Sequence, residues 1–248
     1  MRAQELTESS GYTLAGSYTP DLVFSKLWLA TILNKIFDQQ GIDTVPVAYV
    51  LGSWYGNLAI ILRKLQVPIQ HIVNVETNKE FLQTGQEITQ LMKIKNVKHM
   101  LRDANKLEYK QLKDPGIVIN TSTNDMPDRG WFSNIPPGIL VVLQGRDHVN
   151  NGAIVSPDQL LDQFPLESVL YSGSMNLEDP ETAYRRSMII GVKNNQQLDE
   201  LSFLGSPCTK DCSGHRAGYA WSQRHGGIDA ASWSQSFNNG AALAKAGK

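Results

Sequence analysis

The sequence predicts an α/β fold in which helices cover both faces of a seven-stranded, mostly parallel sheet. Three observations lead to this fold class. Apolar runs of strand length alternate with segments of helical spacing, as in a parallel sheet. A glycine-marked turn joins the first of these runs to a helix. The last two apolar runs are joined by a link too short and too acidic for a crossover helix, which predicts an antiparallel pair.

Length and composition describe an ordinary globular chain. The 248 residues, of which 41% are hydrophobic and 19% charged, can bury one full core and leave room for an appendage. The formal net charge of -1 gives no basic field, so nucleic acid is not favoured as the main partner. No apolar run approaches the roughly 20 residues of a membrane span, and the N-terminus lacks the apolar core of a signal peptide. We therefore expect no membrane association and a cytoplasmic location.

Three segments differ in composition. Residues 1–19 are polar and glycine-marked, which predicts an N-terminal arm. Residues 20–193 contain all the predicted strands and form the main domain. Residues 194–248 are rich in Gly, Ser, Asn, Ala, Trp and His, which predicts a separate and irregular tail module.

The strongest functional signal is a strand, a turn and a helix in succession. Residues 47–51 form an unbroken apolar run, and the turn that follows carries Gly52 and Gly56. Four apolar residues then recur at helical spacing on one face: Leu58, Ile61, Leu62 and Leu65. Glycine lets the backbone approach a ligand, and a helix start offers unpaired N–H groups. This arrangement is typical of a nucleotide-type site.

An acidic residue follows the second predicted strand. Residues 69–75 are apolar enough for a strand and lead directly into Glu76. A carboxylate at this place, about twenty residues beyond the glycine turn, can accept hydrogen bonds from a ribose. Thr77 and Glu80 fit a capping box for the next helix, which leaves Glu76 for a ligand.

Three more strands bring polar residues to the same edge of the sheet. Residues 97–101, 116–120 and 139–143 are predicted strands, because each is a short apolar run bounded by polar residues. Asp103 follows the first of them and either holds an adenine amino group or makes a simple turn or cap. Ligands of parallel sheets bind outside the carboxyl ends of the strands. The residues collected there are Gly52 to Asn57, Glu76, Asp103 and Asn120 to Asp125.

Capping signals mark helices at the two ends of the predicted sheet. Residues 19–21 combine a hydroxyl cap, a proline and an acid, and the helix they open ends near Gly41. Residues 156–159 form a second capping box. Residues 168–172 and 184–192 are the two strands expected to pair antiparallel and finish the sheet.

Five parallel-type strands closed by an antiparallel pair resemble the class I S-adenosylmethionine-dependent methyltransferases, whose sheet is Rossmann-like. The resemblance covers roughly residues 20–193. It implies S-adenosylmethionine as cofactor and methyl transfer to an unidentified acceptor. The resemblance implies that the glycine loop faces the methionine part of the cofactor and that the acid after the second strand binds the ribose. It also implies that the turn after the third strand flanks the adenine, and that the loop after the fourth strand borders the methyl group. The implied cofactor-binding residues are Gly52, Ser53, Trp54, Tyr55, Gly56, Glu76, Thr77, Asp103, Ala104, Asn120 and Thr121.

Three segments are more narrowly similar to methyltransferase-like proteins of tailed phages: LGSWYGN, VINTSTNDMP and ILVVLQGRDH. This similarity implies a host-cell location or association with the virion. A general base is needed only where the acceptor keeps its proton. Asp125 is the first candidate base, and Asp147 or His148 is the next; each also fits a loop or cap role.

Several positions depart from the family pattern. The usual acid two positions before the first glycine is Val50, and the usual middle glycine is Trp54, whose ring narrows the pocket or stacks on the ligand. The motif after the fourth strand lacks the Pro-Pro-aromatic run, which argues against amino methylation of a DNA base. Asn124-Asp125 stands where an acid–histidine pair is expected. A catalytically inactive, structural or adaptor protein of the same fold is therefore the alternative, and a nicotinamide-dependent dehydrogenase is a distant third.

The tail holds a second candidate site. Cys208, Cys212, His215 and His225 are four potential zinc ligands close in sequence, and a bound ion would order a segment poor in aliphatic residues. Two reduced thiols in a glycine-rich loop are the other interpretation. The tail also resembles a short C-terminal segment of other phage proteins, which implies a role in attachment. The aromatic residues that would contact a protein partner are Tyr219, Trp221, Trp233 and Phe237.

Overall fold

The computed structural model describes residues 14–110, 112–126, 128–147, 156–179, 182–193, 202–204, 206–207, 213–230 and 235–247. The chain divides into two compact units, Met1–Asn195 and Gln196–Lys248. No helix among these described residues combines the length and the apolar content that crossing a membrane requires.

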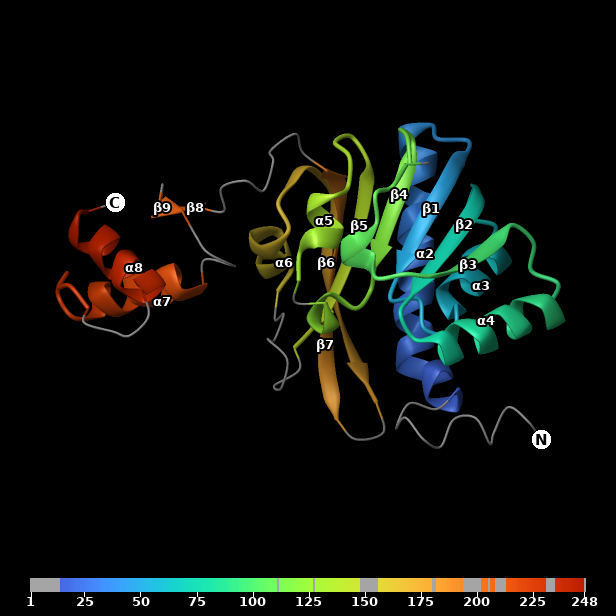
Figure 1. Ribbon diagram of the computed structural model, residues 1–248, viewed down its shortest axis with the longest axis horizontal. Helices are drawn as coiled ribbons and strands as arrows, with labels where there is room; N and C mark the ends of the chain where they lie inside the picture. The colour runs from blue at the N-terminus through green and yellow to red at the C-terminus, as the bar shows by residue number, and fades with distance from the viewer. Residues whose placement is uncertain are drawn as a thin grey trace. The chain divides into compact units, whose positions relative to one another are not determined.

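The first unit is built on one mixed sheet, whose described strands number seven (Figure 1). Their order is β3-β2-β1-β4-β5-β7-β6. The bounds are β1 Val45–Leu51, β2 Ile69–Glu76, β3 Val97–Leu101, β4 Gly116–Asn120, β5 Leu140–Arg146, β6 Leu166–Glu178 and β7 Ala183–Lys193. Strands β1 to β5 pair in parallel, whereas β7 pairs antiparallel with both β5 and β6. The predicted strand set and its antiparallel end are confirmed.

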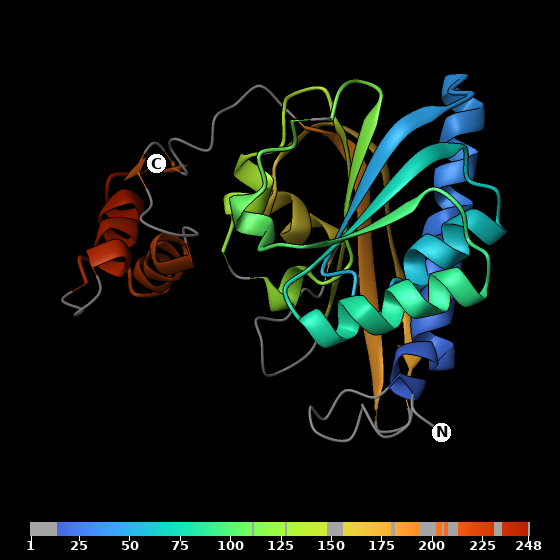
Figure 2. The same cartoon turned by 45° about the vertical axis from the view of Figure 1, so that its right-hand side comes forward.

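The helices of the first unit lie against its sheet (Figure 1 and Figure 2). α2 lies behind the strands in Figure 1 and beside them in Figure 2, so it belongs to the layer on one face. The helical elements of this unit are η1 Ala15–Tyr18, α2 Pro20–Gln40, α3 Asn57–Lys64, α4 Lys79–Leu91, η2 Ala104–Lys106, η3 Thr123–Asp125, α5 Gly130–Ser133 and α6 Pro157–Gln163. The predicted capping box of α6 is present, with Ser156 and Gln159 bonding reciprocally. Between β3 and β4 the described chain has only the short turn η2.

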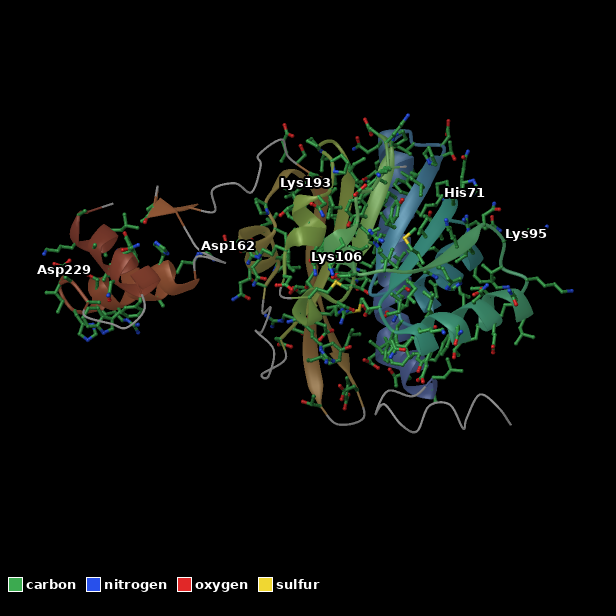
Figure 3. The ribbon with its side chains drawn as sticks, viewed as in Figure 1. His71, Lys95, Lys106, Asp162, Lys193 and Asp229 are labelled. Carbon is green, nitrogen blue, oxygen red and sulfur yellow. The ribbon has the colours of Figure 1, made fainter. Side chains whose placement is uncertain are left out.

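The main core lies between the sheet and α2 and α3. α2 buries Leu29, Leu33 and Phe37, and α3 buries Leu58 and Leu62. These side chains pack on alternate residues of the central strands, including Ala48, Val50, Ile117 and Ile119. On the opposite face, Trp131, Phe132 and Phe164 pack ring against ring. Lys193, labelled in Figure 3, lies 4.7 Å from the centre of the Phe132 ring. Burial on both faces explains why the strands have near-continuous apolar sequences.

The second unit contains two described helices where an irregular tail was expected. α7 spans Ser213–Arg224 and α8 spans Gln235–Lys245. Their backbones approach closely, because a Cβ at Gly218 would fall 1.8 Å from the Phe237 carbonyl oxygen, and one at Gly240 equally close to that of His215. The glycines that indicated irregularity therefore permit close helix packing instead. β8 (Ser202–Phe203) and β9 (Ser206–Pro207) form a short hairpin.

Candidate functional site

The turn after β1 has a left-handed backbone at three positions. The φ angles are 58° at Gly52, 54° at Trp54 and 76° at Gly56. Glycine adopts this region without strain, whereas a tryptophan there requires outside support. The N–H of Ser53 donates to the Val75 carbonyl of β2 at 3.0 Å, and that of Gly56 donates to Ser53 O at 2.8 Å. The turn is thus held against the carboxyl end of β2.

Glu76 supplies the support that Trp54 needs. Its Oε2 accepts a 2.9 Å hydrogen bond from the Trp54 N–H, and its Oε1 accepts from the N–H groups of Thr77 (2.8 Å) and Asn78 (3.0 Å). The sequence placed Trp54 and Glu76 at one edge of the sheet, and this contact brings them together. A carboxylate has about four acceptor positions, so the half-buried Glu76 retains capacity on Oε2 for a ligand.

The cap of α4 differs from the prediction. The capping residue is Asn78, whose Oδ1 accepts from the N–H groups of Glu80 (2.9 Å) and Phe81 (3.3 Å). The predicted Thr77–Glu80 box is therefore wrong by one residue. The Thr77 hydroxyl instead lies 3.4 Å from Glu76 Oε1. An asparagine at this position caps a helix at least as well as threonine, and both fit the sequence.

α4 packs directly against the glycine turn. A Cβ at Gly85 would fall 2.8 Å from the Tyr55 carbonyl oxygen, so only glycine allows this approach. The Trp54 indole stacks on Tyr55 at 5.6 Å between ring centres and meets Phe81 edge-on at 6.3 Å. The large ring that departs from the family pattern thus packs toward the start of α4.

The two residues after β3 have structural roles. Asp103 Oδ1 accepts from the Asn105 N–H at 2.9 Å and caps η2, and its Oδ2 lies 3.8 Å from Lys106 Nζ, a residue labelled in Figure 3. Ala104 is buried. Of the two roles that the sequence left open for Asp103, the cap is the one with a contact in the structure; a contact with adenine stays a prediction.

The loop after β4 packs against the glycine turn. Asn120 is fully buried; its Oδ1 accepts from the Ser122 N–H at 2.8 Å, and its Nδ2 donates to Met126 Sδ at 3.2 Å. The end of the Met126 side chain lies over Gly52, because a Cβ on that glycine would fall 2.6 Å from Met126 Cε. The sequence pattern gave no reason to single out Met126.

The candidate bases differ in exposure and contacts. Asp125 is exposed in η3. Asn124 exchanges two hydrogen bonds with the Arg146 backbone, of 2.9 and 3.0 Å, so it anchors the loop to β5. Asp147 Oδ1 accepts from the Arg185 N–H at 2.6 Å, which is a structural contact. His148 lies outside the described residues. Asp125 is thus the described candidate with the most accessible carboxylate.

A buried polar cluster lies beneath this loop, and sequence reasoning missed it. Tyr184 of β7 donates to Asp21 Oδ2 of α2 at 2.6 Å, and Arg186 of β7 donates to the Thr121 carbonyl oxygen. Ser25 Oγ donates to Gln144 Oε1 at 3.1 Å. Burial lowers the pKa of Arg186, and the nearby carboxylates of Asp21 and Asp125 oppose that shift. Three elements far apart in sequence thereby fix the edge where β4 and β5 end.

The Asp21 carboxyl makes this cluster sensitive to acid. Burial acts to raise its pKa, but hydrogen bonds from Thr19, Tyr184 and nearby N–H groups outweigh burial and lower it. A carboxyl whose pKa is lower in the folded state stabilises the fold above its unfolded pKa, and that contribution is lost as the pH falls through the folded-state value.

We therefore expect the difference in melting temperature between wild type and Asp21→Asn to shrink as the pH is lowered from 7 to below about 4. Thermal melts at pH 7, 4 and 3 measure it. Asp43→Asn, at an exposed position, is the matched control and should change the melting temperature little at pH 7. A constant difference for Asp21→Asn would contradict the role given to this carboxyl.

The described part of the tail does not bring the predicted zinc ligands together. His215 is buried, and its Nε2 lies 3.2 Å from Ser206 Oγ; His225 is exposed, and its Nδ1 lies 2.7 Å from the Trp221 carbonyl oxygen. The backbone positions of His215 and His225 are ten residues apart, which is about 15 Å along the helix axis. This separation is too large for both imidazoles to bind one ion. Cys208 and Cys212 lie outside the described residues. Among the residues that are described, no group of three His, Cys, Asp or Glu side chains could hold a metal ion.

The aromatic residues of the tail are partly engaged within their own unit. Trp221 stacks on His225 with 4.4 Å between ring centres and lies 6.0 Å from Phe237. Trp233 lies outside the described residues. Docking of a protein partner on this unit stays a prediction.

Comparisons with known proteins support the fold. No family model matches the chain, and no curated protein matches it. The chain is similar to the solved YcgJ protein of Bacillus subtilis, with a TM-score of 0.52 and 11% identity, over 70% of this chain and 100% of that one. It is also similar to a magnesium protoporphyrin IX methyltransferase of Synechocystis, solved with bound S-adenosylmethionine, with a TM-score of 0.49 and 12% identity over 77% and 89%. Identities this low show the fold alone.

These observations define the fold of the chain. The chain has a Rossmann-like α/β fold, in which a mostly parallel sheet ends in antiparallel strands and the glycine turn and acid lie at its carboxyl edge. The predicted fold class is confirmed.

Proposed function

We propose that this chain binds S-adenosylmethionine at the carboxyl edge of β1, β2 and β4 and transfers its methyl group to an acceptor. The observation that carries the proposal is the 2.9 Å hydrogen bond between the Trp54 N–H and Glu76 Oε2. It joins the glycine turn to the acid, and because Oε2 accepts only this one described bond, it leaves one acceptor position on that oxygen for a ribose hydroxyl.

The residues present fit such a ligand. A Cβ at Gly56 would fall 2.7 Å from Asn74 Nδ2, so the turn lies directly against β2 there. A Cβ at Gly52 would meet the flexible end of Met126 at 2.6 Å and Ser122 Cβ at 3.7 Å, so a ligand can approach this backbone once the Met126 side chain moves. The first turn of α3 follows directly, with the N–H groups that a helix start leaves without intrahelical partners. In this proposal the turn faces the methionine part and Glu76 binds the ribose.

The cofactor would supply a methyl group on a positively charged sulfur. A nucleophile in line with the C–S bond takes the methyl group, and the sulfur leaves as a neutral thioether. The chain's own residues then have three tasks. Glu76 and the glycine turn fix the ligand, and the loop from Asn120 to Asp125, held by Arg186 and Asn124, borders the acceptor. Asp125, exposed on that loop, takes the proton where the acceptor carries one. Alignment of the two reactants accounts for most of the rate gain in such a transfer.

Calorimetric titration with S-adenosylmethionine and S-adenosylhomocysteine tests the proposal. Binding of both compounds at one site, with dissociation constants of about 1 to 100 μM, is the expected result. A folded protein that gives no heat with either compound would sink the proposal. Incubation with methyl-labelled cofactor and a panel of small-molecule and protein acceptors then identifies the substrate class.

One observation favours a second candidate, a protein of the same fold without catalysis. Each Glu76 oxygen already accepts a hydrogen bond from the protein, and Met126 covers Gly52. In this reading the site edge is structural and the tail makes the functional contact with a partner. The similarity of three segments to phage proteins stays a prediction in both cases. The same titration distinguishes the two candidates.

A further inference from the structure

The Met126 side chain lies in the space that the proposed function assigns to the methionine part of the cofactor. Met126 Cε would be 2.6 Å from a Cβ at Gly52, and Met126 Sδ accepts from Asn120 Nδ2 at 3.2 Å. Gly52 begins the glycine turn, and Asn120 ends β4. Since Leu51 and Asn120 are register partners on adjacent strands, the thioether bridges the two sides of the predicted subsite.

The chemistry of this contact resembles that of the ligand. A methionine side chain is a narrow, unbranched chain with a neutral thioether, and the amino-acid part of S-adenosylhomocysteine is a chain of similar width that also ends at a neutral thioether, so the two can occupy the same space. We propose that Met126 is a reversible internal plug of the methionine subsite, which a bound ligand must displace. This inference rests on the proposed function.

Displacing the plug requires only side-chain rotation. Methionine is unbranched and has three rotatable bonds, so its end can leave without backbone movement. A thioether is a weak acceptor, and the bond from Asn120 Nδ2 is correspondingly easy to exchange. When the plugged state predominates, the apparent affinity equals the affinity of the open site multiplied by the fraction of molecules that are unplugged.

The loop keeps its place without Met126. Thr123 Oγ1 donates to the Gln144 carbonyl oxygen at 2.7 Å, Asn124 is bonded twice to the Arg146 backbone, and Arg186 reaches the Thr121 carbonyl oxygen. Truncating Met126 therefore opens the subsite and leaves these anchors intact. This separation makes the residue a clean target for substitution.

Two ligands and two variants test the plug. S-adenosylhomocysteine carries the amino-acid part, whereas 5′-methylthioadenosine has the same nucleoside and lacks it. Met126→Ala should bind S-adenosylhomocysteine about tenfold more tightly than wild type, as for a site unplugged about one-tenth of the time, and 5′-methylthioadenosine within about twofold of wild type. Met126→Leu keeps about the same apolar volume and should bind S-adenosylhomocysteine no more tightly than wild type.

The outcomes separate this inference from the proposed function. Equal or weaker binding of S-adenosylhomocysteine by Met126→Ala, with wild type binding normally, overturns the plug alone. So does an equal gain for both ligands, because the effect would then not belong to the methionine subsite. Failure of every folded variant to bind either ligand rejects the cofactor site and the plug together. Thermal melts of the three proteins establish that each is folded.

Discussion

Replacing Glu76 by alanine is expected to weaken binding of S-adenosylhomocysteine about 10- to 100-fold. One hydrogen bond between a carboxylate and a ribose hydroxyl contributes about 1.5 to 3 kcal/mol. The same change also removes the acceptor of the Trp54 N–H, so the left-handed turn loses the 2.9 Å hydrogen bond that supports it. Isothermal titration of wild type and variant under identical conditions measures the loss.

The controls for Glu76→Ala isolate the ribose contact. Glu87→Ala removes an exposed acid from α4 and should bind the ligand as wild type does. Glu76→Gln keeps the shape and one acceptor oxygen, and should fall between wild type and alanine. 5′-Methylthioadenosine shares the ribose, so Glu76→Ala should weaken its binding by a similar factor. Unchanged affinity in a folded Glu76→Ala protein would contradict the site.

The second large effect is expected for Gly85→Val, which should cost about 3 kcal/mol of folding free energy. A Cβ at this position would fall 2.8 Å from the Tyr55 carbonyl oxygen and 3.3 Å from Tyr55 Cα, and valine adds two more carbons. α4 then has to move away from the glycine turn. For a unit of this size the melting temperature should drop by about 6 to 12 °C.

Gln86→Val is the matched control for this change. It places the same β-branched residue one position along α4, at an exposed site, so it introduces valine into the helix without the collision. Its melting temperature should stay within about 2 °C of wild type. If Gly85→Val melts with Gln86→Val, the approach of α4 to Tyr55 does not constrain the turn.

The strands and the site edge could be predicted because they rest on local pattern. Strands buried on both faces need apolar runs, and the runs at 116–120 and 97–101 match β4 and β3 residue for residue. A parallel sheet brings the ends of its strands to one edge whatever the loops contain. That geometry is enough to unite Trp54 with Glu76 across 22 residues.

What the sequence could not show depends on contacts between distant residues. The Tyr184–Asp21 bond joins residues 163 positions apart, and no periodicity encodes it. Met126 resembles any loop methionine until its side chain is seen over Gly52. In the tail, the glycine-rich composition predicts irregularity, because the part that Gly218 and Gly240 play in close helix packing appears only when both helices are present.

The reach of Arg186 bears on how the chain is made. Its bond to the Thr121 carbonyl oxygen spans 65 residues and ties the last strand of the sheet to a loop synthesised much earlier. A nascent chain that ends before β7 already contains every parallel strand, but it lacks both Tyr184 and Arg186. The contacts that fix the carboxyl edge are therefore complete only after β7 has left the ribosome.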